Sequence, residues 1–150
     1  MVLHQDFKKL LGLLSANQVE YLVVGGFALG FHGAPRSTGD IDIWIRASEE
    51  NARRMENVLN QFGLSSLGYR TSDFLDKNSV IQLGVPPVRI DIMMSISGVE
   101  FDDAYKNRVI TESAGMVINY IYKEDFIKNK KASGRLKYLA DIESLTQTGD

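Results

Sequence analysis

The chain has 150 residues, 44% of them hydrophobic and 24% charged, a balance typical of one domain that buries an ordinary core. It contains no cysteine and only two histidines, which excludes disulfides, thiolate zinc sites and histidine-rich metal sites. Its formal net charge of -2 excludes a basic coat protein for nucleic acid, although it leaves room for a local basic patch.

Hydrophobic periodicity divides the chain into short helices and strands. Apolar residues three and four positions apart indicate amphipathic helices, while alternation or a short apolar run indicates a strand. In chain order, the predicted elements are helix 5–16, strand 21–24, short helix 27–32, strand 40–45, helix 48–62, a hairpin of strands 79–83 and 88–94, two short strands within 108–122, and helices 123–133 and 135–146. This order predicts an α/β domain of the α+β kind, with a mixed β-sheet flanked by helices.

The chain shows no sign of a membrane segment. No apolar run approaches the roughly 18 residues that span a bilayer. The N-terminal segment carries Asp6 and two lysines within its apolar pattern, so we expect an amphipathic helix and not a secretory signal. We therefore expect a cytoplasmic protein in which residues 1–150 form a single domain, with C-terminal helices over 123–146 packed on it.

The strongest feature is the sequence Asp40-Ile41-Asp42 in the predicted strand 40–45. Residues two apart in a strand point to the same face, so both carboxylates share a face opposite Ile41. Neighbouring carboxylates repel each other unless a divalent cation, an arginine or a lysine compensates their charge. The simpler alternative, two solvated aspartates on an exposed strand face, is favoured for this motif taken alone.

A second strand strengthens the case for a metal site. Arg89 and Asp91 share one face of the predicted strand 88–94, opposite an apolar face. If this strand lies beside the first, Asp91 joins Asp40 and Asp42 around a volume suited to two metal ions about 3.5–4 Å apart. Aspartate is disfavoured in strands, so three of them call for an explanation. Oxygen ligands favour Mg²⁺ or Mn²⁺.

The Gly25-Gly26 turn follows a strand of the buried type and precedes a helix. Without side chains, the backbone can approach a ligand closely, and its N–H groups can point at phosphate oxygens. The sequence matches neither the lysine-containing phosphate loop nor the dinucleotide-binding motif. A Gly-Gly pair is more often a simple turn, and its interest here comes from its position shortly before the aspartates.

These residues resemble the motifs of the DNA polymerase beta-like nucleotidyltransferase superfamily. That superfamily combines a Gly-Gly or Gly-Ser turn at a strand end, D-x-D on the next strand and a third carboxylate on a later strand. The corresponding residues here are Gly25, Gly26, Asp40, Asp42 and Asp91.

One branch of the superfamily is especially similar. The stretch GGFALGFHGAPRSTGDIDI, residues 25–43, resembles abortive-infection (AbiEii-type) nucleotidyltransferase toxins and related uncharacterised domains, in which a His-Gly and an Arg-x-Thr precede the aspartates. The run KNKKASGRLKYLADIESL, which begins at Lys128, is also similar to that branch. It departs from the branch at Tyr138, where an acidic residue is usual.

The resemblance implies a palm-like nucleotidyltransferase fold, with a mixed sheet of about five strands, and the use of a nucleoside triphosphate such as ATP with Mg²⁺ or Mn²⁺. It implies that Asp40, Asp42 and Asp91 are both catalytic residues and metal ligands. Asp91 would serve the ion that activates the acceptor hydroxyl and is a candidate for its base. The candidate nucleotide-binding residues are Gly25, Gly26, Arg36, Thr38, Lys130 and Arg135.

Each polar candidate has a simpler alternative. Arg36 could equally be an exposed loop arginine, and Thr38 is better explained as a turn cap. Lys130 and Arg135 align with the similar branch and belong to a positive patch over 123–137, whose alternative is a solvated helix face. The remaining candidates are better explained structurally: His32 orders a helix end, Arg89 compensates carboxylate charge and Trp44 belongs to the core.

The sequence thus predicts an enzyme that transfers a nucleoside monophosphate from a triphosphate to a hydroxyl acceptor, which could be RNA, protein or a small molecule. A partner protein or a homo-oligomer could complete its site, since 150 residues leave little room for an acceptor domain. The alternative is a non-catalytic binding component of a toxin–antitoxin pair that keeps the same fold. A metal-dependent phosphohydrolase is a weaker third hypothesis, because it does not need the glycine turn.

Overall fold

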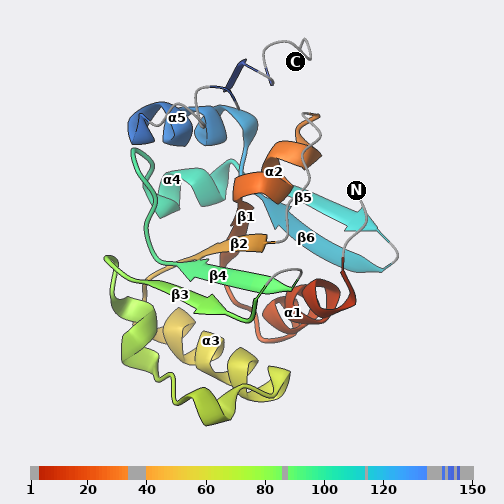
Figure 1. Ribbon diagram of the computed structural model, residues 1–150, viewed down its shortest axis with the longest axis vertical. Helices are drawn as coiled ribbons and strands as arrows, with labels where there is room; N and C mark the ends of the chain where they lie inside the picture. The colour runs from red at the N-terminus through yellow and green to blue at the C-terminus, as the bar shows by residue number, and fades with distance from the viewer. Residues whose placement is uncertain are drawn as a thin grey trace.

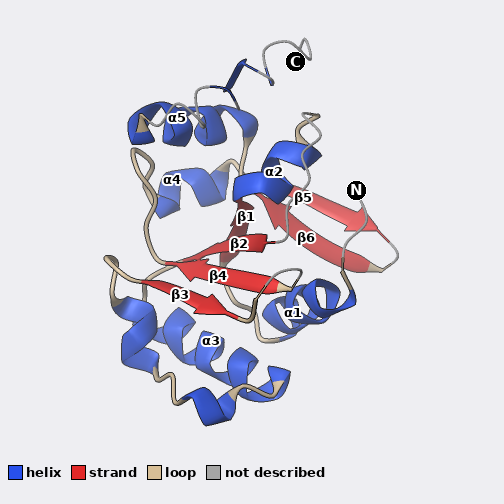
Figure 2. Cartoon of the chain, viewed as in Figure 1, coloured by secondary structure: helices blue, strands red, loops and turns tan. Residues whose placement is uncertain are grey.

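The computed structural model describes residues 4–33, 40–85, 88–113 and 115–134, together with residues 140, 142, 143 and 145. This part of the chain forms six strands and five α-helices, whose arrangement is drawn in Figures 1 and 2. The helices are α1 (Gln5–Ala16), α2 (Gly25–Phe31), α3 (Glu49–Phe62), α4 (Phe101–Lys106) and α5 (Lys123–Ser133). The strands are β1 (Tyr21–Val24), β2 (Asp40–Ile45), β3 (Val80–Leu83), β4 (Arg89–Met93), β5 (Val109–Ser113) and β6 (Met116–Tyr120).

The sheet is mixed, which confirms the predicted fold class. Its strand order is β3-β4-β2-β1-β6-β5. The central pair β2 and β4 is parallel, as is the pair β1 and β6, while the other neighbours are antiparallel. The sheet thus has one strand more than the five that the family resemblance suggested.

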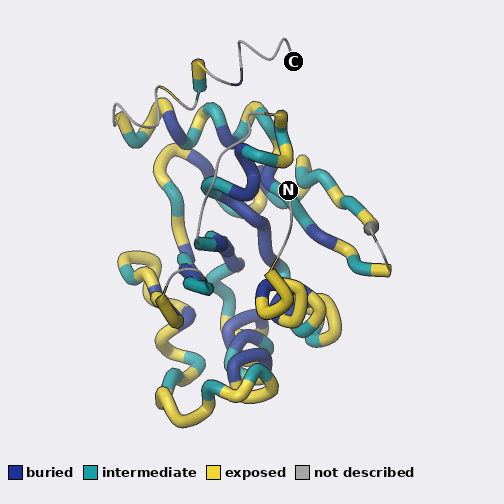
Figure 3. The backbone as a smooth tube through the Cα atoms, turned by 45° about the vertical axis from the view of Figure 1, so that its right-hand side comes forward, coloured by how far each residue is buried: buried dark blue, intermediate teal, exposed yellow. Residues whose placement is uncertain are grey.

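Helices cover both faces of the sheet, and Figure 1 shows α3 on one side and α4 and α5 on the other. The isoleucines of β2 and β4 pack with α1 and α3 in one apolar cluster. Leu22, Trp44 and Phe126 belong to a second cluster on the opposite face, together with residues of α2 and α4. Figure 3 shows this buried interior between mostly exposed outer helix surfaces. Alternation along β2 therefore assigns its isoleucines and its aspartates to different faces.

Two α-helices differ from the prediction. Helix α2 begins at Gly25 and not at residue 27, so the glycine pair forms its first turn. Helix α4 was not predicted, because in six residues with only Ala104 fully buried it has no measurable periodicity. The predicted helix 135–146 falls largely outside the described residues. No helix in the described ranges is long and apolar enough to cross a membrane.

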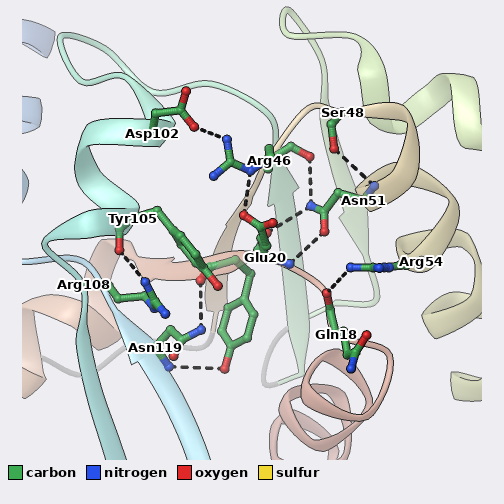
Figure 4. Close-up of polar contacts among 11 residues, drawn as sticks. Gln18, Glu20, Arg46, Ser48, Asn51, Arg54, Asp102, Tyr105, Arg108 and Asn119 are labelled. Atoms are coloured by element: carbon green, nitrogen blue, oxygen red, sulfur yellow. Dashed lines mark hydrogen bonds and ion pairs between the residues drawn. The ribbon is translucent and has the colours of Figure 1, made fainter.

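Helix α3 is fixed to the sheet by the buried side chain of Asn51 (Figure 4). Its amide oxygen accepts the Glu20 N–H at 2.8 Å, and its amide nitrogen donates to the carbonyls of Glu20 at 3.0 Å and Arg46 at 2.9 Å. The helix is capped by Ser48, whose hydroxyl accepts the Asn51 N–H, and ends at Gly63 in the left-handed conformation. These contacts hold the start of β1 and the end of β2 in register.

The junction between β1 and β6 is the narrowest in the sheet. The two strands are matched at one residue pair, Val23 with Tyr120. The Ile121 N–H adds a hydrogen bond to the Val23 carbonyl at 3.1 Å, and the Asn119 side chain reaches the Tyr21 carbonyl at 3.4 Å (Figure 4). The hairpin of β5 and β6 is therefore joined to the rest of the sheet by few backbone contacts.

Candidate active site

The three aspartates singled out from the sequence lie on neighbouring parallel strands. The register of β2 and β4 sets Asp42 directly opposite Asp91, and Asp40 opposite Arg89. Asp40 and Asp42 are half-buried, while Asp91 is only 6% exposed. All of them lie on the face away from the isoleucine cluster, so the structure brings together the carboxylates that the sequence pattern predicted to be neighbours.

Asp42 is the most perturbed of these groups. Its pKa is raised to about 7, mainly because burial disfavours the charged form, and further because Asp91 and Asp40 are like charges nearby. Lys130 acts in the opposite direction and lowers this pKa. A carboxyl crowded in this way gains stability from any cation that reaches it.

Arg89 compensates part of the negative charge, as its position on the strand predicted. Its Nε donates to Asp91 Oδ1 at 3.0 Å, and its Nη2 donates to Asp91 Oδ2 at 2.9 Å. The same Nη2 lies 3.9 Å from Asp40 Oδ2. This two-bond pairing raises the pKa of Arg89 further and uses both oxygens of Asp91.

The donor set suits a hard divalent cation, since it consists of carboxylate oxygens on adjacent strands. Within the described ranges, however, no three acidic or histidine side chains already surround a common point. Asp91 is turned toward Arg89 instead. The residues fit Mg²⁺ or Mn²⁺ by their chemistry, provided that their side chains rearrange.

Gly25 makes room for the Asp42 side chain. It has a φ of +69°, and a Cβ added to it would lie 2.0 Å from Asp42 Oδ2. Any larger residue there would be strained and would displace the carboxylate. Gly26 follows in the first turn of α2, whose N-terminus has no side-chain cap. Glycine is therefore needed at position 25, where the helix start meets Asp42, which a simple turn would not require.

A cavity of about 400 Å³ joins these features to α5. Gly25 and Asp42 line it on one side, and Lys130 lines it on the other. Lys130 is only 8% exposed, and its Nζ lies 5.1 Å from the centre of the Phe126 ring. Asp40 and Asp91 are not among the lining residues. The cavity thus combines the turn, one carboxylate and Lys130, the lysine that was predicted to contact the triphosphate.

The sequence did not indicate the remaining polar lining of the cavity, which includes Ser95, Ser97 and Asn129. Asn129 donates to the Ser97 carbonyl at 3.0 Å and so links α5 to the segment after β4. The only available signal was position, because ligand sites in α/β folds often lie just beyond strand ends. Three predicted contacts, Arg36, Thr38 and Arg135, lie outside the described residues.

His32 and Trp44 have structural roles, as expected. His32 Nε2 lies 2.6 Å from the Ile121 carbonyl, and burial lowers the pKa of its imidazole. Trp44 is 1% exposed and meets Phe101 edge to face, with ring centres 5.0 Å apart. Neither side chain lines the cavity at Asp42.

The fold is that of known nucleotidyltransferase structures. A protein described as a candidate nucleotidyltransferase from Thermotoga maritima is similar at 20% identity and a TM-score of 0.57, over 95% of this chain and 89% of that one. The lincosamide antibiotic adenylyltransferase LnuA, with lincomycin bound, is similar at 17% identity and a TM-score of 0.56, over 97% of both chains. The antibiotic-resistance factor ANT(2'')-Ia is similar at 14% identity and 0.56, over 95% of this chain and 82% of that one.

No protein-family model matches the sequence, and no curated protein sequence does. The identities above show the fold alone. The chemistry of this chain must therefore be argued from its own residues.

Proposed function

We propose that this chain is a metal-dependent nucleotidyltransferase, which transfers a nucleoside monophosphate from a nucleoside triphosphate such as ATP to a hydroxyl acceptor. The observation that carries the proposal is the register of β2 and β4, which sets Asp42 beside Asp91. Gly25 and Lys130 lie in the same cavity as Asp42. Carboxylates beside a side-chain-free turn and a buried lysine suit a polyphosphate carried with divalent metal ions.

Each group has a part in this reaction. Asp40, Asp42 and Asp91 would hold two Mg²⁺ or Mn²⁺ ions, which when bound activate the attacking oxygen and stabilise the leaving pyrophosphate. Asp91 would accept the proton of the acceptor hydroxyl. The new bond joins the acceptor oxygen to the α-phosphorus, and the bond between the α-phosphorus and the bridging oxygen breaks to release pyrophosphate.

The predicted triphosphate contacts follow from the cavity. Lys130, which belongs to α5, would neutralise part of the phosphate charge. The backbone at Gly25 and Gly26 would approach the phosphates closely. Arg36, Thr38 and Arg135 complete this set as predictions from the sequence. The acceptor would be RNA, protein or a small molecule, and a partner protein or second copy could supply part of its site.

The first test measures metal-dependent nucleotide binding by thermal unfolding. ATP, GTP, CTP and UTP are each added with and without Mg²⁺ to the full chain and to Asp42→Asn. A triphosphate at about 100 times its Kd stabilises the folded state by about 2.7 kcal/mol, so one of the four should raise the Tm only when Mg²⁺ is present. Asp103→Asn is the matched control, because Asp103 is an exposed residue of α4.

The second test measures transfer itself. Triphosphates labelled at the α-phosphate are incubated with the protein and with total RNA and protein extracts, and both label transfer and pyrophosphate release are followed. Asp42→Asn should reduce transfer at least about 1000-fold, since losing metal coordination removes several kcal/mol of transition-state stabilisation. Metal-independent nucleotide binding without transfer would instead indicate a binding module, and the absence of any triphosphate response would overturn the proposal.

A further inference from the structure

Arg89 binds both oxygens of Asp91, a carboxylate that the proposed function assigns to metal ions. Asp91 is buried, and both of its oxygens accept hydrogen bonds from the same guanidinium group. A carboxylate that binds a cation must offer a lone pair in the direction of that cation. At least one of the two bonds to Arg89 must therefore break or rearrange before Asp91 can serve as a ligand.

We propose that Arg89 is a built-in counter-cation, which a divalent metal ion displaces from Asp91, and that this competition makes metal binding depend on the nucleotide. The inference rests on the proposed function, since it concerns the metal ions of that reaction. It assigns Arg89 a role beyond structural charge compensation. Without nucleotide the guanidinium pairs with Asp91, and with nucleotide a metal ion replaces it there.

The charges around the site explain why the nucleotide matters. Three carboxylates, from Asp40, Asp42 and Asp91, face two cations, Arg89 and Lys130. Even with Asp42 ionised, as a bound metal ion favours, the net charge of this group is only a single negative charge. One divalent ion therefore makes the group positive, and a second is repelled. A triphosphate supplies several negative charges at once, and it offers the displaced guanidinium a new bidentate partner.

The position of Arg89 allows this displacement. Its side chain is 31% exposed, whereas the Asp91 side chain is 9% exposed, so the guanidinium lies at the outer side of the pair. Asp40 Oδ2 is already 3.9 Å from Arg89 Nη2 and offers an alternative partner close by. The guanidinium can leave Asp91 without any movement of the apolar core, because Arg89 is on the opposite face of β4 from Ile90 and Ile92.

The experiment measures Mn²⁺ binding by electron paramagnetic resonance on the full, chelator-treated chain. Wild type, Arg89→Met and Arg89→Lys are titrated with and without a non-hydrolysable ATP analogue. In wild type, the analogue should tighten Mn²⁺ binding at least about 10-fold. In the absence of the analogue, Arg89→Met should bind Mn²⁺ about 10-fold more tightly than wild type does. Adding the analogue should then increase the Mn²⁺ affinity of this variant by a smaller factor than in wild type.

Two further variants keep the result interpretable. Arg89→Lys keeps the charge but cannot form the two-bond pair, so its Mn²⁺ affinity should lie between the others, and it carries the test if Arg89→Met does not fold. Arg54→Met is the matched control, because Arg54 pairs with Glu50 on the surface of α3, and it should bind Mn²⁺ as wild type does.

The outcomes separate the two proposals. For these outcomes Asp42→Asn is titrated as well, and the wild-type titration is repeated with each of ATP, GTP, CTP and UTP. If Mn²⁺ binds wild type but not Asp42→Asn, and both Arg89 variants bind it no more tightly than wild type, Arg89 is not a competitor and only this inference fails. If Mn²⁺ does not bind wild type with any of the four triphosphates, the proposed function fails, and the inference that rests on it fails too.

Discussion

At the scale of single residues, the fold holds like-charged carboxylates close together on neighbouring strands, although they repel one another. Asp42 has the clearest consequence. Its pKa is about 7 in the folded protein, far above the ordinary value of 3.8, because burial and the charges of Asp91 and Asp40 disfavour ionisation. In the metal-free protein, ionised Asp42 therefore lowers the free energy of unfolding.

This shift predicts a pH dependence of the metal-free protein. Between about pH 4 and pH 7 the folded chain retains a proton that the unfolded chain has lost, so the free energy of unfolding falls as pH rises through this window. A shift of this size contributes up to about 4 kcal/mol, since each pKa unit corresponds to about 1.4 kcal/mol. Denaturant unfolding at pH 5 and pH 8, with chelator present, checks the sign.

Asp42→Asn isolates the effect, because the amide does not titrate. Its free energy of unfolding should exceed that of wild type at pH 8 and should depend less on pH, while other carboxyls contribute alike to both proteins. Parallel pH profiles for the two proteins would mean that Asp42 ionises normally in the folded chain.

Residue patterns predicted the carboxylate pairing well but not the finer arrangement. Period-2 alternation placed Asp40 with Asp42 on one strand face and Arg89 with Asp91 on another, because this depends only on strand geometry. That Asp91 lies beside Asp42 depended on the further assumption that the two strands are neighbours, which the structure bears out. The capture of Asp91 by Arg89 depends on rotamers, and the contact of Gly25 with Asp42 depends on the crossing of α2 over β2. Such details arise from tertiary packing and leave no local signal in the sequence.

At the scale of elements, helix α3 shows how a buried polar side chain can set the position of a helix. Asn51 makes three hydrogen bonds to backbone groups of Glu20 and Arg46 while only 2% exposed. Those backbone groups lie just beyond the ends of β1 and β2, where the Arg46 N–H also donates to the Glu20 carbonyl at 3.2 Å. The Asn51 side chain therefore adds to the backbone pairing at this end of the two strands.

Replacing this side chain should be costly. Asn51→Ala leaves buried N–H and C=O groups unsatisfied and should lower the free energy of unfolding by about 2–4 kcal/mol. Asn57→Ala, at an exposed position of the same helix, should change it by no more than about 0.5 kcal/mol. Urea unfolding of both variants provides the comparison, and similar values for the two would show that the Asn51 contacts contribute little.

The elements themselves were largely predictable where the pattern is long or the ends are marked. Helix α3 has Ser48 and Gly63 at its ends, and β2 alternates over its whole length, so both were predicted at their observed bounds. Helix α4 escaped prediction because six residues contain less than two turns. Strand order was not predictable beyond the pairing of hairpin neighbours, because long-range register depends on the packing of both faces.

At the scale of the whole molecule, the apolar cluster on the site's face joins segments from both ends of the chain. Leu22 and Ala28 from the first elements and Leu145 from the C-terminal part are buried in it together with Trp44. Leu145 itself is fully buried. The wall of the site that carries α5 is thus continuous with this packing.

Leu145→Ala should therefore destabilise the whole fold by about 2–5 kcal/mol, as for a buried leucine in a core. Leu67→Ala is the control, because Leu67 is 54% exposed, and its effect should stay below about 1 kcal/mol. Thermal unfolding measures both. An unaffected Tm in Leu145→Ala would show that the C-terminal segment is dispensable for stability.

The narrow junction between β1 and β6 has a consequence for motion across the cavity. Helix α5 continues directly from β6, whereas Gly25 and Asp42 belong to the strands on the other side of that junction. One backbone hydrogen bond joins Ile121 to Val23, so strand pairing alone holds the two walls together only weakly. Helix α5 is also held by Phe126, which packs with Leu22 and Trp44, and by the hydrogen bond from Asn129 to Ser97. Any movement of Lys130 away from the carboxylates therefore has to loosen these side-chain contacts as well as the strand pairing.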